Sequence, residues 1–261
     1  MSLLDLADDL YLLLHVLHHL PFQNWITLSN TSRYMDSCIR NCFFEVMHTH
    51  LLEFVPEQRI PKFFSLLLQT NSIVTGSLPL TMLGVLPWGQ GKDLIVYSPI
   101  AAKRRWDHRF RWKLDSESFF GTGGAIHSTQ QLSSYMARSL VLQGGLVRMV
   151  YVNGPHVLDV LAKASETALF SCLTATSLIT AYPRMTLHHQ TLTLIVTDSG
   201  QTIGAECLFD FQPVAFRQHM PAGYAGIRTW SDSMTMVFHW SEFASELERL
   251  GGGFAWSFPS D

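Results

Sequence analysis

Leucines recur at three- and four-residue intervals near the start of the chain, the spacing produced by one face of an amphipathic helix. They are Leu6, Leu10, Leu13, Leu14, Leu17 and Leu20. Pro21 ends this pattern, because proline has no backbone N–H to donate inside a helix. A second helix is expected after it, capped by Asn24, whose side-chain oxygen can accept a free backbone N–H. The apolar positions of that second helix are Ile26, Leu28, Tyr34, Met35 and Ile39.

The rest of the chain mixes helical and strand-like patterns. Helices are expected over 43–70, with interruptions at Pro56 and Pro61, and over 125–143, 156–180 and 241–250. Strands are expected over 73–75, 93–97, 146–152 and 234–238, and a hairpin over 191–208 around the turn 198–201. The predicted fold class is α+β, with N-terminal helices followed by a mixed-sheet α/β body.

Three segments near the start have the spacing of a known motif: Leu6-Ala7-Asp8-Asp9-Leu10, Pro21-Phe22-Gln23-Asn24-Trp25-Ile26-Thr27-Leu28-Ser29 and Ser32-Arg33-Tyr34-Met35. Over about residues 4–45 the spacing resembles an F-box, which docks a protein onto the Skp-type adaptor of a cullin–RING ubiquitin ligase. Ala7 replaces the usual proline and Asp9 the usual glutamate. The resemblance implies adaptor docking through Leu10, Leu13, Leu17, Leu20, Pro21, Trp25 and Leu28. The alternative is an ordinary helical pair packed on the domain behind it.

A strand pattern ending in Gly76-Ser77, then Asp93-Leu94-Ile95-Val96-Tyr97, resembles the nucleotidyltransferase fold. In that family a Gly-Ser turn approaches a triphosphate, and carboxylates on two later strands hold two divalent cations. Here Ile95 replaces the second carboxylate. The strand 146–151 has no carboxylate and carries Arg148 instead. Hard cations need oxygen ligands, so the resemblance implies a pseudoenzyme without catalytic or metal-binding residues. Gly76, Ser77, Asp93 and Arg148 would form a vestigial nucleotide site, or else be turn residues of another α/β domain.

The order of both motifs, followed by Leu173-Thr174-Ala175 and Tyr182-Pro183-Arg184, resembles a group of F-box-like proteins of mushroom-type fungi. In that group the body is a nucleotidyltransferase-like domain, here degenerate. The resemblance spans about residues 4–210. Together with the helix and strand pattern, it predicts an F-box-like motif at 1–45, a helical linker at 46–70 and a degenerate nucleotidyltransferase-like domain at 71–250. The glycines at 251–253 predict a loose tail at 251–261.

Composition narrows the class of protein. The chain has 261 residues, of which 47% are hydrophobic and 15% charged, enough apolar content for a sizeable core. The net charge of −3 gives no general attraction to nucleic acid or anionic membranes. We expect no membrane span, no secretory signal, and a cytoplasmic or nuclear location. The 4 cysteines do not form a disulfide framework, and the 12 histidines have no zinc-like spacing.

Residues 103–113 read Lys-Arg-Arg-Trp-Asp-His-Arg-Phe-Arg-Trp-Lys and carry six of the 18 basic residues. Basic residues interleaved with aromatics can bind nucleic acid by phosphate contacts and base stacking. The alternation of Phe110 and Trp112 with Arg109 and Arg111 equally fits a strand with one buried face. Three interpretations of this stretch stay open: a solvated strand or helix face, a surface for an acidic protein partner, and a surface for nucleic acid. The first is favoured.

Together these patterns predict a non-catalytic intracellular interaction protein. Its expected partners are a Skp-type adaptor and a protein client, without nucleic acid, membrane or cofactor. The first alternative is a metal-dependent nucleotidyltransferase with displaced ligands, which would require Mg²⁺. The second is a non-catalytic module that binds nucleotide or nucleic acid.

Overall fold

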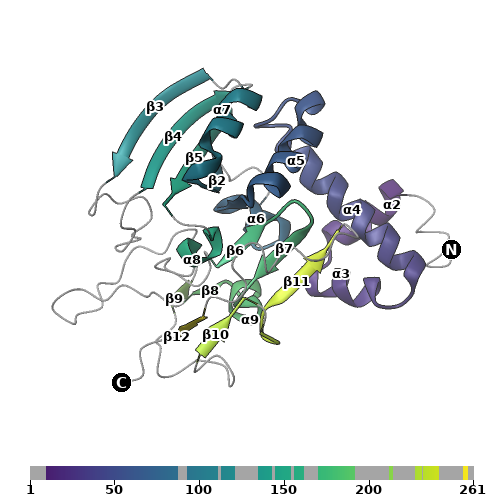
Figure 1. Cartoon of the computed structure of the whole chain (residues 1–261). Coiled ribbons are helices and arrows are strands. Elements are labelled where there is room, and N and C mark those ends of the chain that lie inside the picture. The colour runs from purple at the N-terminus through teal and green to yellow at the C-terminus, as the bar shows by residue number, and fades with distance from the viewer. Residues whose placement is uncertain are drawn as a thin grey trace.

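The computed structural model describes residues 10–87, 93–110, 113–120, 135–142, 145–153, 156–161, 170–191, 212–213, 227–230, 232–240 and 255–257. These residues combine helices with a mixed β-sheet, which confirms the helix-and-sheet character of the predicted α+β class (Figure 1). The helices gather towards the N-terminal part of the chain, and most of the strands follow them.

Three helices open the described chain: α2 (Leu10–His18), α3 (Phe22–Ser29) and α4 (Arg33–Leu51). The single helix predicted after Pro21 is therefore wrong, since α3 and α4 divide that segment between them. Asn24 is not a cap either, because α3 begins directly after Pro21, whose extended backbone and fixed φ suit the start of a helix. Ser32 is the side-chain cap, and its hydroxyl accepts the Met35 N–H at 3.1 Å at the start of α4.

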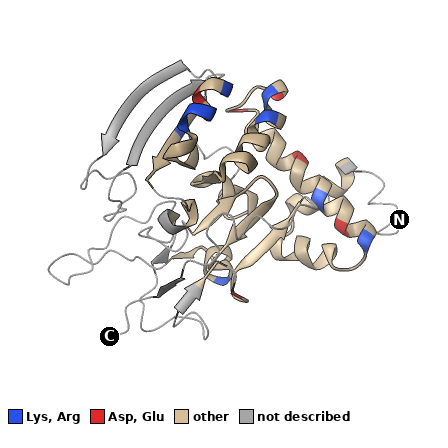
Figure 2. Cartoon of the chain, viewed as in Figure 1, with Lys and Arg blue, Asp and Glu red and all other residues tan. Residues whose placement is uncertain are grey.

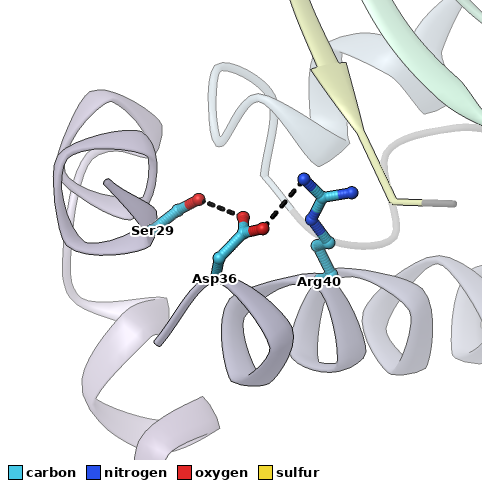
Figure 3. Close-up of polar contacts among 3 residues, drawn as sticks. All are labelled: Ser29, Asp36 and Arg40. Carbon is cyan, nitrogen blue, oxygen red and sulfur yellow. Dashed lines mark hydrogen bonds and ion pairs between the residues drawn. The ribbon is translucent and has the colours of Figure 1, made fainter. Parts of the chain in front are cut away.

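A polar contact around Asp36 links α3 to α4. The Ser29 hydroxyl donates to one carboxylate oxygen of Asp36, and Arg40 pairs with the other oxygen at 2.9 Å (Figure 3). Partial burial alone raises the pKa of Asp36. The hydrogen bonds from Arg40 and Ser29 and the charge of Arg40 outweigh that effect and hold the pKa below its ordinary value. Asp36 also lies in the first turn of α4, where the helix dipole favours a negative charge.

The remaining helices are short. They are η1 (Glu57–Arg59), α5 (Ile60–Thr70), α6 (Ser77–Met82), η2 (Ile100–Ala102), α7 (Lys103–Phe110), α8 (Val157–Leu161) and α9 (Pro183–Leu187). Pro61 does not interrupt a helix, because it lies in the first turn of α5, where its missing N–H has no partner to lose. Pro183 likewise starts α9 instead of ending a helix.

Eight strands form one sheet in the order β11-β7-β6-β1-β2-β5-β4-β3. Neighbouring strands are antiparallel except for β2 and β5, which pair in parallel. The strands are β1 (Ile73–Thr75), β2 (Asp93–Pro99), β3 (Lys113–Phe120), β4 (Tyr135–Leu142), β5 (Gly145–Val152), β6 (Ser171–Leu173), β7 (Ser177–Thr180) and β11 (Met236–His239). Two small pairs lie outside it: β8 (Gln190–Thr191) with β9 (Gln212–Pro213), and β10 (Ile227–Thr229) with β12 (Ala255–Ser257).

The strands predicted over 73–75, 93–97, 146–152 and 234–238 are confirmed as β1, β2, β5 and β11. Two helix predictions are wrong in whole or in part. The segment predicted as helix over 125–143 contains β4, which is hydrogen-bonded on both sides. The helical segment predicted over 156–180 is confirmed only at its start, where α8 lies, and its last part contains β6 and β7. Pairing with neighbouring strands overrides the weak local preference there. The 191–208 hairpin beyond Thr191 and the 241–250 helix lie outside the described residues, and β12 lies within the tail expected to be loose.

Each face of the sheet buries its own core. On β2, Leu94 and Val96 face a core shared with α4, α5, α6 and α7. Side chains alternate along a strand, so Ile95 and Tyr97 face the opposite side, and both are buried there. The β2 and β5 strands at the centre of the sheet are thus covered on both faces, as expected for a parallel pair.

Candidate functional site

The four residues of the predicted nucleotide site gather at one end of three neighbouring strands. Thr75 of β1 lies opposite Ile95 of β2, so the chain leaves β1 at Gly76 beside the end of β2 that begins with Asp93. On the other side of β2, Leu146 lies opposite Asp93 and Arg148 opposite Ile95. The topology therefore brings Gly76, Ser77, Asp93 and Arg148 together. Their binding of nucleotide stays a prediction.

Gly76 is required by the fold at this turn. Its φ is +83° and its ψ −139°, a conformation that L side chains rarely adopt. A Cβ added there would come within 3.0 Å of the Ile95 Cδ1. The Ile95 side chain, which replaces the second carboxylate of the family pattern, therefore packs against the turn. The glycine has a structural explanation independent of any phosphate.

Ser77 begins α6 and is buried, as are all the residues from Ser77 to Met82. The helix is six residues long, and no side chain caps its start. Few peptide dipoles are aligned in so short a helix, and burial limits the approach of an anion. This start of α6 therefore offers much less to a triphosphate than the long, open helix of a phosphate-binding turn.

The positions where the resemblance predicts metal ligands also offer little to a cation. Ile95 provides no oxygen ligand, and the half-buried Arg148 lies beside it in the register, where its positive charge opposes a bound cation. In the part of the chain that the structure describes, no three His, Cys, Asp or Glu side chains form a group that could hold a metal ion.

The adaptor-docking leucines divide into two sets. Leu13, Leu17 and Trp25 are buried in the chain's own core, and the Trp25 indole N–H donates to the Leu17 carbonyl at 2.9 Å. Leu20 and Leu28 are half-buried and Pro21 is exposed. Leu10 lies at the start of α2, and its side chain is outside the described set. The buried set holds α2 and α3 to the rest of the chain and is not available to a partner.

Inside the chain these helices pack on β11. The sequence predicted this strand but not its contact with the helices. Phe238 packs against Phe22 and Phe43, with ring centroids 5.4 and 4.9 Å apart, and Trp240 stacks on Phe43 at 5.2 Å. The strand pattern at 234–238 was a usable signal for β11. Nothing in that pattern indicates a partner some two hundred residues earlier.

Residues Lys103 to Phe110 of the basic–aromatic stretch form α7 and Lys113 begins β3, so the favoured strand or helix face is a helix over 103–110. Trp106 and Phe110 lie four residues apart, on one helix face, and both are fully buried. They pack on Phe63 of α5, at ring distances of 5.7 and 6.0 Å. Trp112 lies outside the described residues. The described aromatics of this stretch are therefore not available for stacking on bases.

Other side chains capable of chemistry, among them two cysteines and a Ser–His pair, lie in or beside the core. Burial raises the pKa of the Cys42 thiol to about 12, and the charges of Cys38 and Glu45 add to the shift, so the reactive thiolate is disfavoured. The pKa of the Cys172 thiol is also raised by burial. The Ser177 hydroxyl and the His239 Nδ1 lie 2.6 Å apart across the β7–β11 pair, a contact that the sequence did not indicate. Ser177 is buried and His239 is half-buried, so the pair lies at the edge of the core.

No family model, curated protein or solved structure matches the chain. Among the described residues, no helix combines the length and the apolar character needed to cross a bilayer. The assignment of function therefore depends on the side chains and surfaces of the chain itself.

Proposed function

We propose that this chain is a non-catalytic interaction protein of the cytoplasm or nucleus. In this proposal the outer side of α2 and α3 docks a Skp-type adaptor, as in F-box-like proteins. The sheet-containing body, a degenerate nucleotidyltransferase-like domain, holds a protein client. A client carried beside an adaptor-docking helix pair would be presented to a ubiquitin ligase.

The observation that carries the proposal is a set of apolar side chains on the α2–α3 pair that border the core and stay partly or largely accessible. Tyr11 is 86% exposed, and Leu14, three residues further along α2, is only partly buried. Leu20 and Leu28 are also partly buried. Residues three apart on a helix are neighbours, so Tyr11 and Leu14 share one surface. Tyrosine is among the residues enriched at the energetic centre of protein–protein interfaces.

The non-catalytic part of the proposal is supported by the environment of residue 95. An enzyme of this fold needs two metal ions to stabilise the attacking and leaving oxygens. The position of the second carboxylate is held by Ile95, which is 4% exposed and packs on Gly76. No described carboxylate replaces it on β5, where Arg148 is the neighbour in register.

The test is co-purification of the full chain with a purified Skp-type adaptor. Tyr11→Ser and Leu28→Ser should each weaken the complex at least about tenfold, as expected for apolar anchors at the centre of an interface. Ile100→Ser is the matched control, because Ile100 is 44% exposed and lies at the far end of β2. Failure of the wild-type chain to bind the adaptor, or equal losses in the control, would show that the three helices are purely structural.

A further inference from the structure

A seam between α5 and α7 collects basic side chains on a rigid surface. The two helices run in opposite directions there. Arg59, before the start of α5, donates to the Phe110 carbonyl at the end of α7, at 2.6 Å. Arg105 in the middle of α7 donates to the Gln69 carbonyl near the end of α5, at 3.2 Å. Below the seam, Phe63 packs on Trp106 and Phe110. The helices are thus tied together at both ends and through their buried rings.

Spacing along both helices defines the outer surface of this seam. Lys62, Ser65 and Gln69 are all exposed and lie three and four residues apart, which places them on one face of α5. Arg105 and Arg109 are exposed and four apart on α7. We call this surface, from Arg59 and Lys62 to Arg105 and Arg109, the α5–α7 seam.

The charge of this surface is opposite to that of the chain. The segments 57–62 and 103–110 carry six basic residues and two acidic ones, in a chain whose net charge is −3. One acidic residue, Asp107, is paired with Lys103 at 3.2 Å, so its charge is largely neutralised. Figure 2 shows the resulting concentration of blue on α7 and beside the start of α5. Such a surface attracts an anionic partner over distances of about a Debye length.

We propose that the α5–α7 seam binds an acidic peptide segment of a protein partner. Arginine guanidinium groups pair with carboxylates through two parallel hydrogen bonds, and Arg105 and Arg109 present two such groups one helical turn apart. Ser65 and Gln69, which hydrogen-bond to each other at 2.9 Å, add polar groups for a peptide backbone. This inference rests on the proposed function, since it assigns a surface and a chemistry to the client.

Nucleic acid fits the same surface less well. Proteins that bind single strands combine basic residues with exposed aromatic rings on which bases stack. In this seam the rings of Phe63, Trp106 and Phe110 are fully buried and serve the core. The surface therefore supplies charge and hydrogen bonds without a stacking platform, which favours carboxylates over bases.

The experiment is a fluorescence-anisotropy titration of the full chain with a short labelled peptide rich in Asp and Glu. A peptide with Asn and Gln at the same positions and a single-stranded oligonucleotide are the comparison probes. The test variant is Lys62→Gln with Arg109→Gln, which spares the two arginines that tie the helices. The matched control is Arg33→Gln with Arg184→Gln, two exposed positions on α4 and α9 that remove the same charge.

The acidic peptide should bind and the amide peptide should not, with affinity falling as salt rises. The test variant should bind about three- to tenfold more weakly, the sum of two exposed charge contacts. The control should match the wild type. No binding of the acidic peptide, equal losses in test and control variants, or tighter binding of the oligonucleotide would each overturn the inference.

Adaptor co-purification separates the two proposals. The Lys62→Gln, Arg109→Gln variant should keep its adaptor, because the seam is formed by α5 and α7 and not by α2 and α3. A variant that loses peptide binding but keeps the adaptor has lost the client surface alone. If the chain binds the peptide but cannot hold an adaptor, the docking proposal is wrong and the proposal for the seam stands.

Discussion

Replacing Gly76 by alanine tests whether the Gly-Ser turn is required by the fold itself. Two costs add at this position. A non-glycine residue at a φ of +83° and ψ of −139° is strained by about 1–3 kcal/mol. The new Cβ would also lie 3.0 Å from the Ile95 Cδ1, and an overpacked contact in a closed core costs about 1–3 kcal/mol. Gly76→Ala should therefore lower the free energy of unfolding by about 2–6 kcal/mol.

Gly84 provides the matched control. Its φ is also positive, at +70°, but an added Cβ would meet no atom within 4 Å. Gly84→Ala should cost only the conformational term, about 1–2 kcal/mol. Urea unfolding followed by circular dichroism gives both values. Thermal midpoints should fall by about 2–4 °C for each kcal/mol lost.

A double-mutant cycle isolates the contact with Ile95. Ile95→Val removes the Cδ1 atom and should cost about 0.5–1.5 kcal/mol by itself. In the double variant with Gly76→Ala the losses should be less than additive by about 1 kcal/mol, because the close contact is gone. Strict additivity, or a Gly76→Ala loss equal to that of Gly84→Ala, would refute the packing argument and leave room for a glycine selected by a ligand.

Two further predictions concern the site and pH. The purified chain, mixed with each nucleoside triphosphate and Mg²⁺ or Mn²⁺, should release no pyrophosphate above background. The reason is that Asp93 alone cannot hold two cations. Turnover that disappears in Asp93→Asn would restore the enzyme alternative. Burial lowers the pKa of His50 below 6.5, and the charge of His18 adds to this, so the unfolded chain takes up the proton first. Stability should thus be complete above pH 6.5 and fall as the pH drops below it. His50→Gln should flatten this slope in pH-dependent unfolding, and a slope equal to that of the wild type would contradict the assignment.

The elements that the sequence predicted well are those with strong local patterns. The leucine spacing of 10–20 is helical whatever the chain packs against, and β1, β2 and β5 are rich in the β-branched residues that favour strands. The α7 helix was harder to predict, because two patterns overlap there. Its two large rings are spaced for one face of a helix, whereas the alternation near its end also suits a strand. Burial of those rings on Phe63, some forty residues earlier, settled the choice.

The β6–β7 hairpin shows why other strands were missed. Half of its residues are serine or threonine, whose hydroxyls compete locally with backbone hydrogen bonds and give little periodicity. The Thr174 hydroxyl accepts the N–H groups of Thr176 and Ser177, which closes the turn. Ser171 and Thr180 are then joined across the strands at 2.8 Å. These contacts depend on the paired state and are not visible as a pattern in the sequence.

The candidate site depended even more on long-range pairing. Three short motifs in the sequence suggested Gly76, Asp93 and Arg148, but only the register of β1, β2 and β5 places them at one end of the sheet. The same register revealed that Ile95 fills the space beside Gly76. Residue 95, where the resemblance predicts a metal ligand, is thus a packing position, so introducing a carboxylate by Ile95→Asp would open a core contact as well as add a charge.

The F-box-like spacing illustrates a general difficulty with helical docking motifs. Leucines spaced for one helix face serve equally well to bury that face inside the same chain. Here Leu13, Leu17 and Trp25 are buried in a core to which α4, Phe238 and Trp240 also contribute. Substituting them would damage the core and the docking surface at once. The side chains that best distinguish an adaptor-docking pair from a structural pair are the exposed Tyr11 and the partly accessible Leu20 and Leu28, and substitutions there separate the two explanations.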